Sequence, residues 1–487
     1  MTFNTGKLET FQAILNNPVT MASSSKWSHR NILKKFGITI GSTFFPFSLW
    51  AKNETGEPLI LPENPLYKSL SKPVTAITLG AGARGNVYGD YAIEYPGQLK
   101  IVGVAEPNHL RNDRYATRHS IPVANCFFSW NDVFRKPKFA DAVIISTPDQ
   151  LHYEPCMEAL KQGYDILLEK PISPSEEECR NILDLAKRTG RIVAVCHVLR
   201  YAPYFIKLRE LMQSGTIGEV ISVQHMEPID HVHMSHSYVR GNWHKSNETA
   251  PILLAKSCHD LDVIKWMLGK NSKKIQAFGN LKWFKKENAP AGSRERCTDG
   301  CAVESTCPYS ALKIYYRERQ RTYVFDLPEK KRNQAGAIMN YLKTTDYGRC
   351  VYRMENDQCD HYTTNILFDE GITVTFNMEA FTPWGGRRTR IMGSMGYLEG
   401  DMHRFKIYDF RTDKTRTYNT HINDVEHYKN EGHGGGDWRL VSDWIQAVAQ
   451  HNPNLLTSTI DASIESHIMC FMAEKSRQNN TVMDVVV

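Results

Sequence analysis

Residues 74–85 read Val-Thr-Ala-Ile-Thr-Leu-Gly-Ala-Gly-Ala-Arg-Gly, a short apolar run that ends in three spaced glycines. The first six residues are largely apolar or β-branched, which predicts a buried strand. In such a turn Gly80 allows the sharp bend, Gly82 lets the backbone approach a pyrophosphate, and Gly85 lets the next helix pack closely. The N-terminus of that helix favours an anion. We therefore predict cofactor contacts from Gly80, Gly82, Arg84, Gly85 and Asn86.

A second strand is expected over residues 99–105, and it ends at Glu106. A carboxylate at this position can accept both ribose hydroxyls of adenosine and repels a 2′-phosphate. The sequence therefore predicts NAD rather than NADP. Arg111 and Arg114 follow closely and keep NADP open as the alternative.

The alternation of strands and helices continues, with strands expected at 141–146, 164–168 and 191–196 and helices at 152–163 and 176–189. Repeated β–α units predict a parallel, doubly wound sheet whose ligands bind at the carboxyl ends of the strands. Further cofactor contacts are expected from the residues at those ends, namely Thr147, Pro148, His152, Glu169, Lys170 and His197.

Three motifs together resemble the glucose–fructose oxidoreductase/inositol dehydrogenase (Gfo/Idh/MocA) family. They are Gly80–Gly85, Thr147-Pro148-Asp149 with His152, and Glu169-Lys170-Pro171, and the resemblance extends over 72–487. It implies an α/β protein with a Rossmann domain and a second α/β domain built on a large open, mostly antiparallel sheet. Family members oxidise or reduce sugars and cyclitols with NAD(P), and a homo-oligomer is implied. We expect a leader and linker at 1–71, a Rossmann domain at 72–198, and a substrate domain at 199–487 with a cysteine-rich insertion around 290–350.

Oxidation of an alcohol needs a base for the hydroxyl proton and a cofactor for the hydride. Lys170 is expected close to the nicotinamide, and the resemblance implies that His259 is its partner in proton transfer. The family has an aspartate four residues before this histidine, where this chain has Ala255 followed by Lys256. The polar stretch 226–243 is expected to be an irregular sugar-binding loop. The predicted substrate contacts are Arg200, Tyr201, His236, Tyr238, Arg240, Trp243 and Lys256.

Four cysteines form a separate candidate site. Cys297, Cys301 and Cys307 lie within eleven positions, and Cys350 follows later. Thiolates at short spacing around a turn suit a structural Zn²⁺ ion. An iron–sulfur cluster and a disulfide pair are the alternatives.

The N-terminal stretch has the pattern of an export signal. Residues 28–35 are basic, 36–50 are mostly apolar, and Ala51 follows at a position suited to cleavage. The segment is similar to a twin-arginine leader in which His29 replaces the first arginine. A periplasmic location is therefore expected, and a cytoplasmic one if the leader is not functional. The alternative is an amphipathic N-terminal arm.

Composition excludes other classes of protein. The net charge of +6 over 487 residues is mild, and no basic run with interleaved aromatics occurs, which argues against nucleic-acid binding. The body of the chain contains no apolar segment long enough to span a membrane, so no span is expected in the mature chain.

Three functions remain open. The first is an NAD-dependent oxidoreductase that acts on a carbohydrate, and the second is a glycoside-cleaving enzyme that recycles bound NAD. The third is a noncatalytic NAD-sensing or structural protein. The glycine-rich run 432–437 is expected to border the active site, with Asp437 capping the helix that follows.

Overall fold

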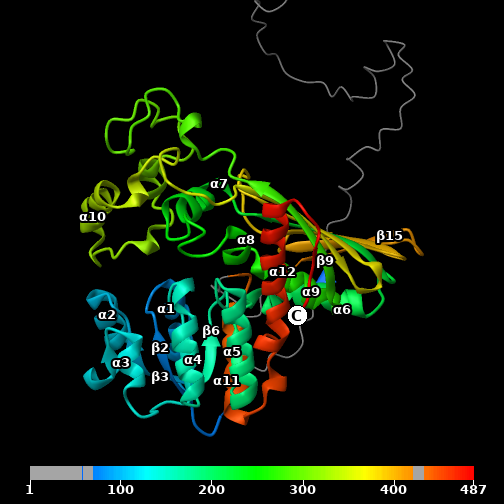
Figure 1. Ribbon diagram of the computed structural model, residues 1–487, viewed down its shortest axis with the longest axis horizontal. Coiled ribbons are helices and arrows are strands. Elements are labelled where there is room, and N and C mark those ends of the chain that lie inside the picture. Colours follow the sequence, from blue (N-terminus) through cyan, green and yellow to red (C-terminus); the bar gives the residue numbers. More distant parts are fainter. Residues whose placement is uncertain (1–56, 59–69, 420–432) are drawn as a thin grey trace, which may run out of the picture. The chain divides into compact units, whose positions relative to one another are not determined.

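The computed structural model describes residues 57–58, 70–419 and 433–487 (Figure 1). The export-signal prediction falls on residues 28–51, which lie outside the described residues.

The first sheet has six parallel strands. Their spatial order is β4 (Cys126–Phe127), β3 (Leu99–Ala105), β2 (Val74–Leu79), β5 (Ala142–Ile145), β6 (Asp165–Leu168) and β7 (Val193–Val195). Counted along the chain this is the 3-2-1-4-5-6 order of dinucleotide-binding folds. The predicted doubly wound sheet is therefore confirmed. Strands β5 and β6 are buried at every residue, because helices cover both faces of a parallel sheet.

Helices alternate with these strands, as the sequence predicts. They are α1 (Ala83–Glu94), α2 (His109–His119), α3 (Trp130–Phe134), α4 (Tyr153–Lys161) and α5 (Glu176–Thr189). Helix α5 shows why the chain is helical there. The Ser175 side chain accepts the Glu178 N–H, acidic residues occupy the first turn, and Gly190 ends the helix in a left-handed conformation. A late segment, α11 (Asp437–Gln450), joins the same hydrophobic core through residues such as Trp444.

The second sheet has ten strands. Their order is β1 (Glu57–Pro58), β15 (Lys414–Asn419), β14 (Arg404–Asp409), β13 (Gly396–Gly400), β12 (Arg388–Gly393), β8 (Val220–Pro228), β11 (Thr373–Glu379), β10 (His361–Phe368), β9 (Ser272–Asn280) and β16 (Met483–Asp484). Only β8–β11 and β1–β15 pair in parallel among these strands. The expected large, mostly antiparallel sheet is thus confirmed.

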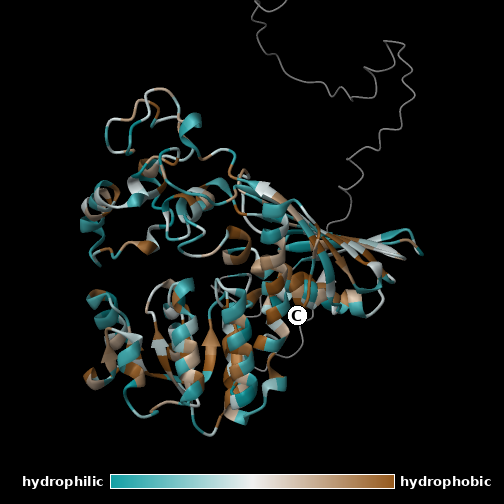
Figure 2. Cartoon of the chain, in the orientation of Figure 1, coloured by the Kyte–Doolittle hydropathy of each residue, from teal (hydrophilic) through white to brown (hydrophobic). Residues whose placement is uncertain are grey.

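Helix α12 (Ile460–Asn479) packs on β9 and on α9 (Cys258–Leu268), and α9 in turn contacts β8 and α6 (Pro203–Gln213). Strands β10 and β11 alternate between buried and more exposed residues, the pattern of a sheet with one face against a core. Figure 2 shows brown apolar residues concentrated in the strands and teal residues on the outer helices.

Between β9 and β10 an insertion, residues 281–360, forms a small body with its own core of Tyr315, Phe325, Ile338 and Leu342. Its main helix is α10 (Lys331–Thr344). The stretch expected as an irregular loop at 226–243 is mostly regular, which corrects that prediction. It comprises the end of β8, α7 (His231–His233) and the π-helix η7 (Met234–Arg240).

The shorter elements connect the larger ones. Helix α8 covers Ile252–Ala255, a second π-helix η9 covers Leu312–Arg317, and 3₁₀ turns lie at η4 (Val123–Asn125), η5 (Asp149–Leu151), η6 (Val198–Tyr201), η8 (Lys286–Asn288), η10 (Thr322–Val324), η11 (Asp346–Gly348), η12 (Asp369–Gly371) and η14 (Pro453–Leu455). A search of the described helices finds none with the length and apolarity needed to cross a membrane.

Candidate active site

The turn after β2 is shaped for a nucleotide. Gly80 has φ +90°, and a Cβ there would lie 2.7 Å from the Ser146 carbonyl oxygen. A Cβ on Gly85 would collide with the Gly80 carbonyl, so helix α1 could not approach the turn. Gly82 differs, because a Cβ there would meet nothing within 4 Å. The backbone at Gly82 therefore faces open space, which fits the approach of a pyrophosphate.

Two polar side chains hold this turn in place. The Glu106 carboxylate, only 5% exposed, accepts the Ala81 N–H at 2.8 Å and the Asn108 N–H at 2.9 Å. The Asn86 amide donates to the carbonyls of Ala81 and Gly82 at 2.9 and 2.8 Å. Glu106 thus stands at the end of β3, where a ribose is expected, with its orientation fixed by backbone donors.

Arg84 ties the turn to distant parts of the chain. Its guanidinium contacts Glu169 at 2.5 Å and Asp437 at 2.7 Å. Burial raises the pKa of Asp437, but Arg84 and His433 outweigh this effect, so that the pKa lies below its ordinary value. Asp437 is the first residue of α11 and caps no backbone N–H, which corrects the predicted N-cap role. Its carboxylate instead holds the His433 Nδ1 at 3.2 Å.

Lys170 and His259, the two predicted catalytic residues, come from different domains and lie close enough for the Lys170 charge to act on the His259 ring. Lys170 follows β6, and its Nζ donates to the Ala255 carbonyl at 2.6 Å. His259 lies one turn further along, at the start of α9. Its ring centroid is 5.9 Å from that of His197 and 5.6 Å from that of His433. These groups therefore face one region at the carboxyl ends of β6 and β7.

Burial keeps the imidazoles of this region neutral. It lowers the pKa of His259 and of His197 well below the ordinary histidine value, with the positive charge of Lys170 adding to the effect. The buried His259 Nδ1 has no hydrogen-bond partner among the described residues. A neutral imidazole is a group that can accept a proton from a bound alcohol.

A network of buried charges lies on the side of the ten-stranded sheet. Lys256 Nζ is 3.1 Å from Glu227 Oε1, and Arg387 Nε is 2.5 Å from Glu227 Oε2 and 2.9 Å from Asp260 Oδ1. His225 Nε2 lies 3.1 Å from Asp260. Burial lowers the pKa of Lys256 and raises that of Glu227. The two carboxylates of this network and its lysine and arginine carry equal and opposite charge, and buried charges need such pairing.

The sequence indicated only Lys256 of this network as a site residue. Asp260 directly follows His259, and that adjacency is the one signal that could have pointed to it. Arg387 reaches the network from the loop before β12, more than a hundred residues away, and the sequence offers no signal for it.

The Thr-Pro-Asp turn after β5 is fixed from both sides. His152 contacts the Pro171 carbonyl through Nδ1 at 2.7 Å and the Thr147 carbonyl through Nε2 at 3.0 Å. Trp243 Nε1 donates to Asp149 Oδ2 at 2.8 Å, and Tyr238 packs near Trp243 at 6.1 Å between ring centroids. Of the predicted substrate residues, Trp243 and Tyr238 thus lie beside this turn, and Lys256, paired with Glu227, lies near Lys170.

Two predicted substrate residues after β7 lie in the interior. Arg200 is 3% exposed, and its guanidinium binds the Asp262 carboxylate at 2.7 and 2.6 Å. The Tyr201 hydroxyl is 3.1 Å from Ser458 Oγ. Because these polar groups are already bonded within the core, the structure does not support contact with a substrate.

His236 and Arg240, also predicted to contact substrate, support the insertion instead. His236 Nδ1 lies 2.8 Å from the Tyr315 hydroxyl. Arg240 donates to the carbonyls of Tyr309 and Arg349 at 2.7 Å each. The π-helix η7 turns these two residues toward the insertion, so the structure again does not support substrate contact.

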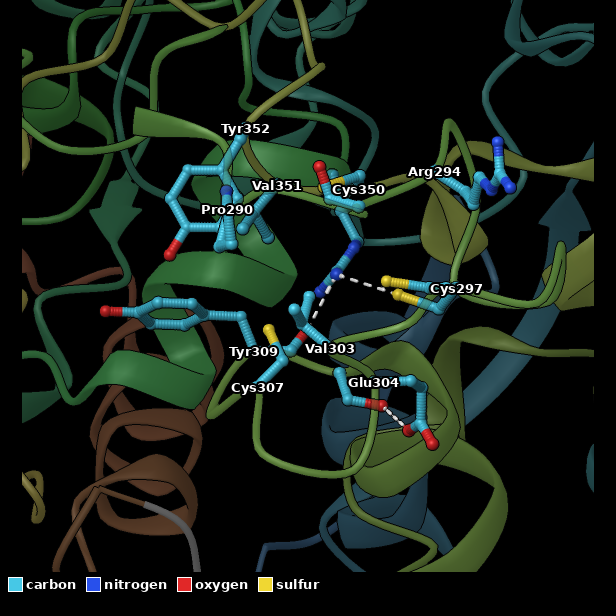
Figure 3. Close-up of a pocket in the computed structure, with 14 residues that line it drawn as sticks. Pro290, Arg294, Cys297, Val303, Glu304, Cys307, Tyr309, Cys350, Val351 and Tyr352 are labelled. Carbon is cyan, nitrogen blue, oxygen red and sulfur yellow. Dashed lines mark hydrogen bonds between the residues drawn. The ribbon is translucent and has the colours of Figure 1, made fainter. Parts of the chain in front are cut away.

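The four cysteines predicted to bind metal do line one pocket, which Figure 3 shows with Cys297, Cys307 and Cys350 labelled. Arg240 enters the same pocket, with Nη2 3.9 Å from Cys297 Sγ. Within the described ranges, however, no group of three or more cysteine, histidine, aspartate or glutamate side chains is placed to hold a metal ion. Burial raises the pKa of Cys307 and Cys350, so both side chains are thiols in the metal-free protein. The structure therefore does not support the zinc prediction, and the cysteines, Cys301 included, are free rather than disulfide-bonded.

Comparison with protein families settles the class of this fold. Residues 75–197 match the oxidoreductase family with an NAD-binding Rossmann fold, and residues 209–485 match the C-terminal α/β domain of the same family. The chain belongs to the Gfo/Idh/MocA oxidoreductase family. It is therefore an oxidoreductase of this type with an NAD-binding Rossmann domain, as its motifs indicated.

Relatives within the family are distant. Bacillus subtilis YteT, which is named as an oxidoreductase, is 26% identical over 313 residues, 62% of this chain and 71% of that protein. Inositol 2-dehydrogenase of Corynebacterium glutamicum is 29% identical over 202 residues, 41% of this chain and 56% of that protein. The chain thus spans little more than half the length of this inositol dehydrogenase.

Two solved structures share the fold. A levoglucosan dehydrogenase, in complex with NADH and levoglucosan, is 16% identical with a TM-score of 0.62, covering 85% of this chain and 100% of that one. An inositol dehydrogenase homologue from Azotobacter vinelandii, in complex with NADH and myo-inositol, is 14% identical with a TM-score of 0.59, covering 85% and 98%.

Proposed function

We propose that this protein oxidises a hydroxyl group of a sugar or cyclitol, or reduces the corresponding carbonyl, with NAD as the hydride carrier and with Lys170 and His259 in proton transfer. The solved structures of similar fold hold levoglucosan and myo-inositol, which supports a polyhydroxylated substrate. The substrate contacts proposed are Tyr238, Trp243 and Lys256.

One observation carries the proposal, namely the contact of Lys170 Nζ with the Ala255 carbonyl at 2.6 Å. It places the Lys170 ammonium beside the start of the His259 helix. Glu169, the residue before Lys170, is bound to Arg84 of the nucleotide turn. Two contacts therefore join the cofactor turn to the Glu169–Lys170 pair and join Lys170 to the segment that precedes the His259 helix.

NAD, when bound, supplies the acceptor for the hydride of the alcohol carbon. Gly80, Gly82 and Glu106 would hold it, and Lys170 would lie at its reactive end. The neutral imidazole of His259 accepts the hydroxyl proton. Lys170 Nζ, anchored on the Ala255 carbonyl, keeps donors free to stabilise the developing alkoxide. Because Ala255 has no side-chain carboxylate, no proton can pass through a side chain at that position.

A glycoside-cleaving enzyme that recycles bound NAD is the second candidate, and two observations favour it. The first is the alanine at position 255, where the family resemblance implies an aspartate. The second is a relative from Escherichia coli that is named 2,7-anhydro-N-acetylneuraminate hydratase rather than a dehydrogenase. It is 28% identical over 148 residues, 30% of this chain and 39% of that protein.

The ultraviolet spectrum of the purified protein with NAD separates the two candidates when sugars, cyclitols and aryl glycosides are added in turn. Absorbance of reduced nicotinamide that grows in proportion to added NAD establishes a net dehydrogenase. Release of aglycone with no net reduction establishes the glycoside-cleaving enzyme. A protein that binds NAD but gives neither signal with any substrate contradicts both, and leaves the noncatalytic function.

We also propose that the enzyme is exported to the periplasm and forms a homo-oligomer. The basic and apolar pattern of residues 28–51 supports export, and the family resemblance supports oligomerisation. Fractionation of cells that express the full chain, and the mass of the native particle in solution, test these two proposals.

A further inference from the structure

The insertion reaches the cofactor side of the Rossmann domain, and Asp326 makes the contact. Arg111 Nε donates to Asp326 Oδ1 at 2.8 Å, and Asn108 Nδ2 donates to Asp326 Oδ2 at 3.3 Å. Arg114 Nη2 donates to the Leu327 carbonyl at 3.3 Å. Figure 1 shows α10, the helix that follows this loop, on the same side of the molecule as α2.

The Rossmann residues in this contact surround the ribose position. Asn108 caps α2 by accepting the Arg111 N–H at 3.1 Å, and its own N–H binds Glu106. Glu106 is the carboxylate expected to meet the adenosine ribose. A 2′-phosphate would have to enter here, and in such folds an arginine close to this position accommodates it.

Asp326 is held by the core of the insertion. Its backbone N–H donates to the Tyr341 hydroxyl on α10 at 3.1 Å. The neighbouring Phe325, which is buried, stacks on Tyr341 with ring centroids 4.8 Å apart and planes within 13°. The carboxylate is therefore presented by a packed scaffold.

We propose that Asp326 is a specificity-determining residue that makes the protein prefer NAD over NADP. It does so by occupying Arg111, a cation close to Glu106 and to the position expected for a 2′-phosphate. With Asp326 present, two carboxylates, Glu106 and Asp326, face one bound arginine, and a phosphate dianion is repelled. The hydrogen bond that Arg111 donates to Asp326 raises the pKa of Arg111, in keeping with a tight charge pair. This inference rests on the proposed use of a nicotinamide cofactor.

The test measures binding and does not depend on turnover. Nicotinamide fluorescence titrations give the dissociation constants of NADH and NADPH for the wild type, Asp326→Asn, Asp326→Glu, Arg111→Ala and the double variant Asp326→Asn/Arg111→Ala. Glu329→Gln is the matched control, because Glu329 is an exposed acid three residues further along the same loop.

The wild type should bind NADH more tightly than NADPH. Asp326→Asn should tighten NADPH binding about tenfold or more, since a charge-assisted hydrogen bond becomes available to the phosphate, and should change NADH binding by less than about threefold. Asp326→Glu and Glu329→Gln should keep the wild-type preference. The gain for NADPH should disappear in the double variant, because it requires a free Arg111.

An Asp326→Asn protein with wild-type thermal stability and an unchanged ratio of the two dissociation constants overturns the inference, and so does a gain that survives without Arg111. In both cases NADH binding by the wild type leaves the proposed function standing. A wild type that binds neither nucleotide refutes the proposed function itself, and the inference with it.

Discussion

The candidate site has a Rossmann wall, formed by residues after the parallel strands, and an opposite wall, formed by residues on the side of the ten-stranded sheet. The two walls are organised in different ways. On the Rossmann side, Glu106 and Lys170 each stand within two residues of the end of a strand in a parallel sheet, so their place follows from the local sequence. On the side of the ten-stranded sheet, Glu227, Lys256 and Arg387 come from separate segments and meet through side-chain contacts. The first wall is organised by strand order and the second by charge pairing in a buried environment.

Replacement of Lys170 tests the Rossmann wall and should have the largest effect. Lys170→Met removes the group proposed to stabilise the alkoxide, and kcat should fall about 10²- to 10⁴-fold while NADH binding persists. Steady-state kinetics and a nucleotide titration measure the two quantities. Lys187→Met, on the exposed surface of α5, is the control. A variant within about tenfold of wild-type activity rules out the assigned role.

The opposite wall is tested by Glu227→Gln. This change leaves Arg387 and Lys256 with one carboxylate fewer in a buried site, and the free energy of unfolding should drop by about 3–5 kcal/mol. Urea denaturation measures the loss. Glu219→Gln, an exposed position just before the same strand, should change stability by less than about 0.5 kcal/mol. Equal losses in both variants would mean that the network contributes nothing of its own.

Substitutions at two positions of the segment 234–243 distinguish a residue that supports the insertion from a residue of the active site. Arg240→Met should lower the free energy of unfolding by about 1–3 kcal/mol, because it leaves the carbonyls of Tyr309 and Arg349 unpaired, and KM for the sugar should not change. Trp243→Phe should instead alter kcat/KM, because it removes the bond to Asp149. A raised KM in Arg240→Met would restore Arg240 to the substrate site.

The smallest expected effect is the change in the free energy of unfolding that each buried histidine causes when the pH is lowered. Burial lowers the pKa of His236 and His467 to about 3, so between about pH 6.5 and that value the unfolded chain binds protons that the native protein does not. Stability should therefore fall as the pH falls from 7 to 5, by about 1.4 kcal/mol per pH unit for each such histidine.

Denaturation at pH 7, 6 and 5 measures this slope. His467→Asn should flatten it, while His109→Gln, at an exposed position, should leave it unchanged. A free energy of unfolding that stays constant over this range would show that these buried histidines do not remain neutral.

A comparison of particular elements shows which features of the fold the local sequence predicts. Strands β2 and β3 and helix α5 have the bounds that the sequence predicts, because apolar runs, caps and glycines are local signals. The Glu-Lys-Pro turn after β6 was likewise expected. By contrast, the sequence predicts a loop where the structure has the π-helix η7. A stretch of polar residues is typical of an exposed loop, and the sequence alone does not show the partners that bury these residues.

By itself, the sequence determined the Rossmann fold, the nucleotide turn and the place of Lys170 at the end of a strand, since each follows from a motif whose spacing imposes its geometry. The role of His259 rests on the family resemblance. The tertiary structure alone decided three further points. It paired Arg387 with Glu227 and Asp260, and it turned Arg240 toward the cysteine pocket. It also brought Asp326 of the insertion to Arg111 beside the ribose position. The physical reason is that charge pairing and burial depend on distance in space, and residues 215 positions apart in the chain carry no local sign that they will meet.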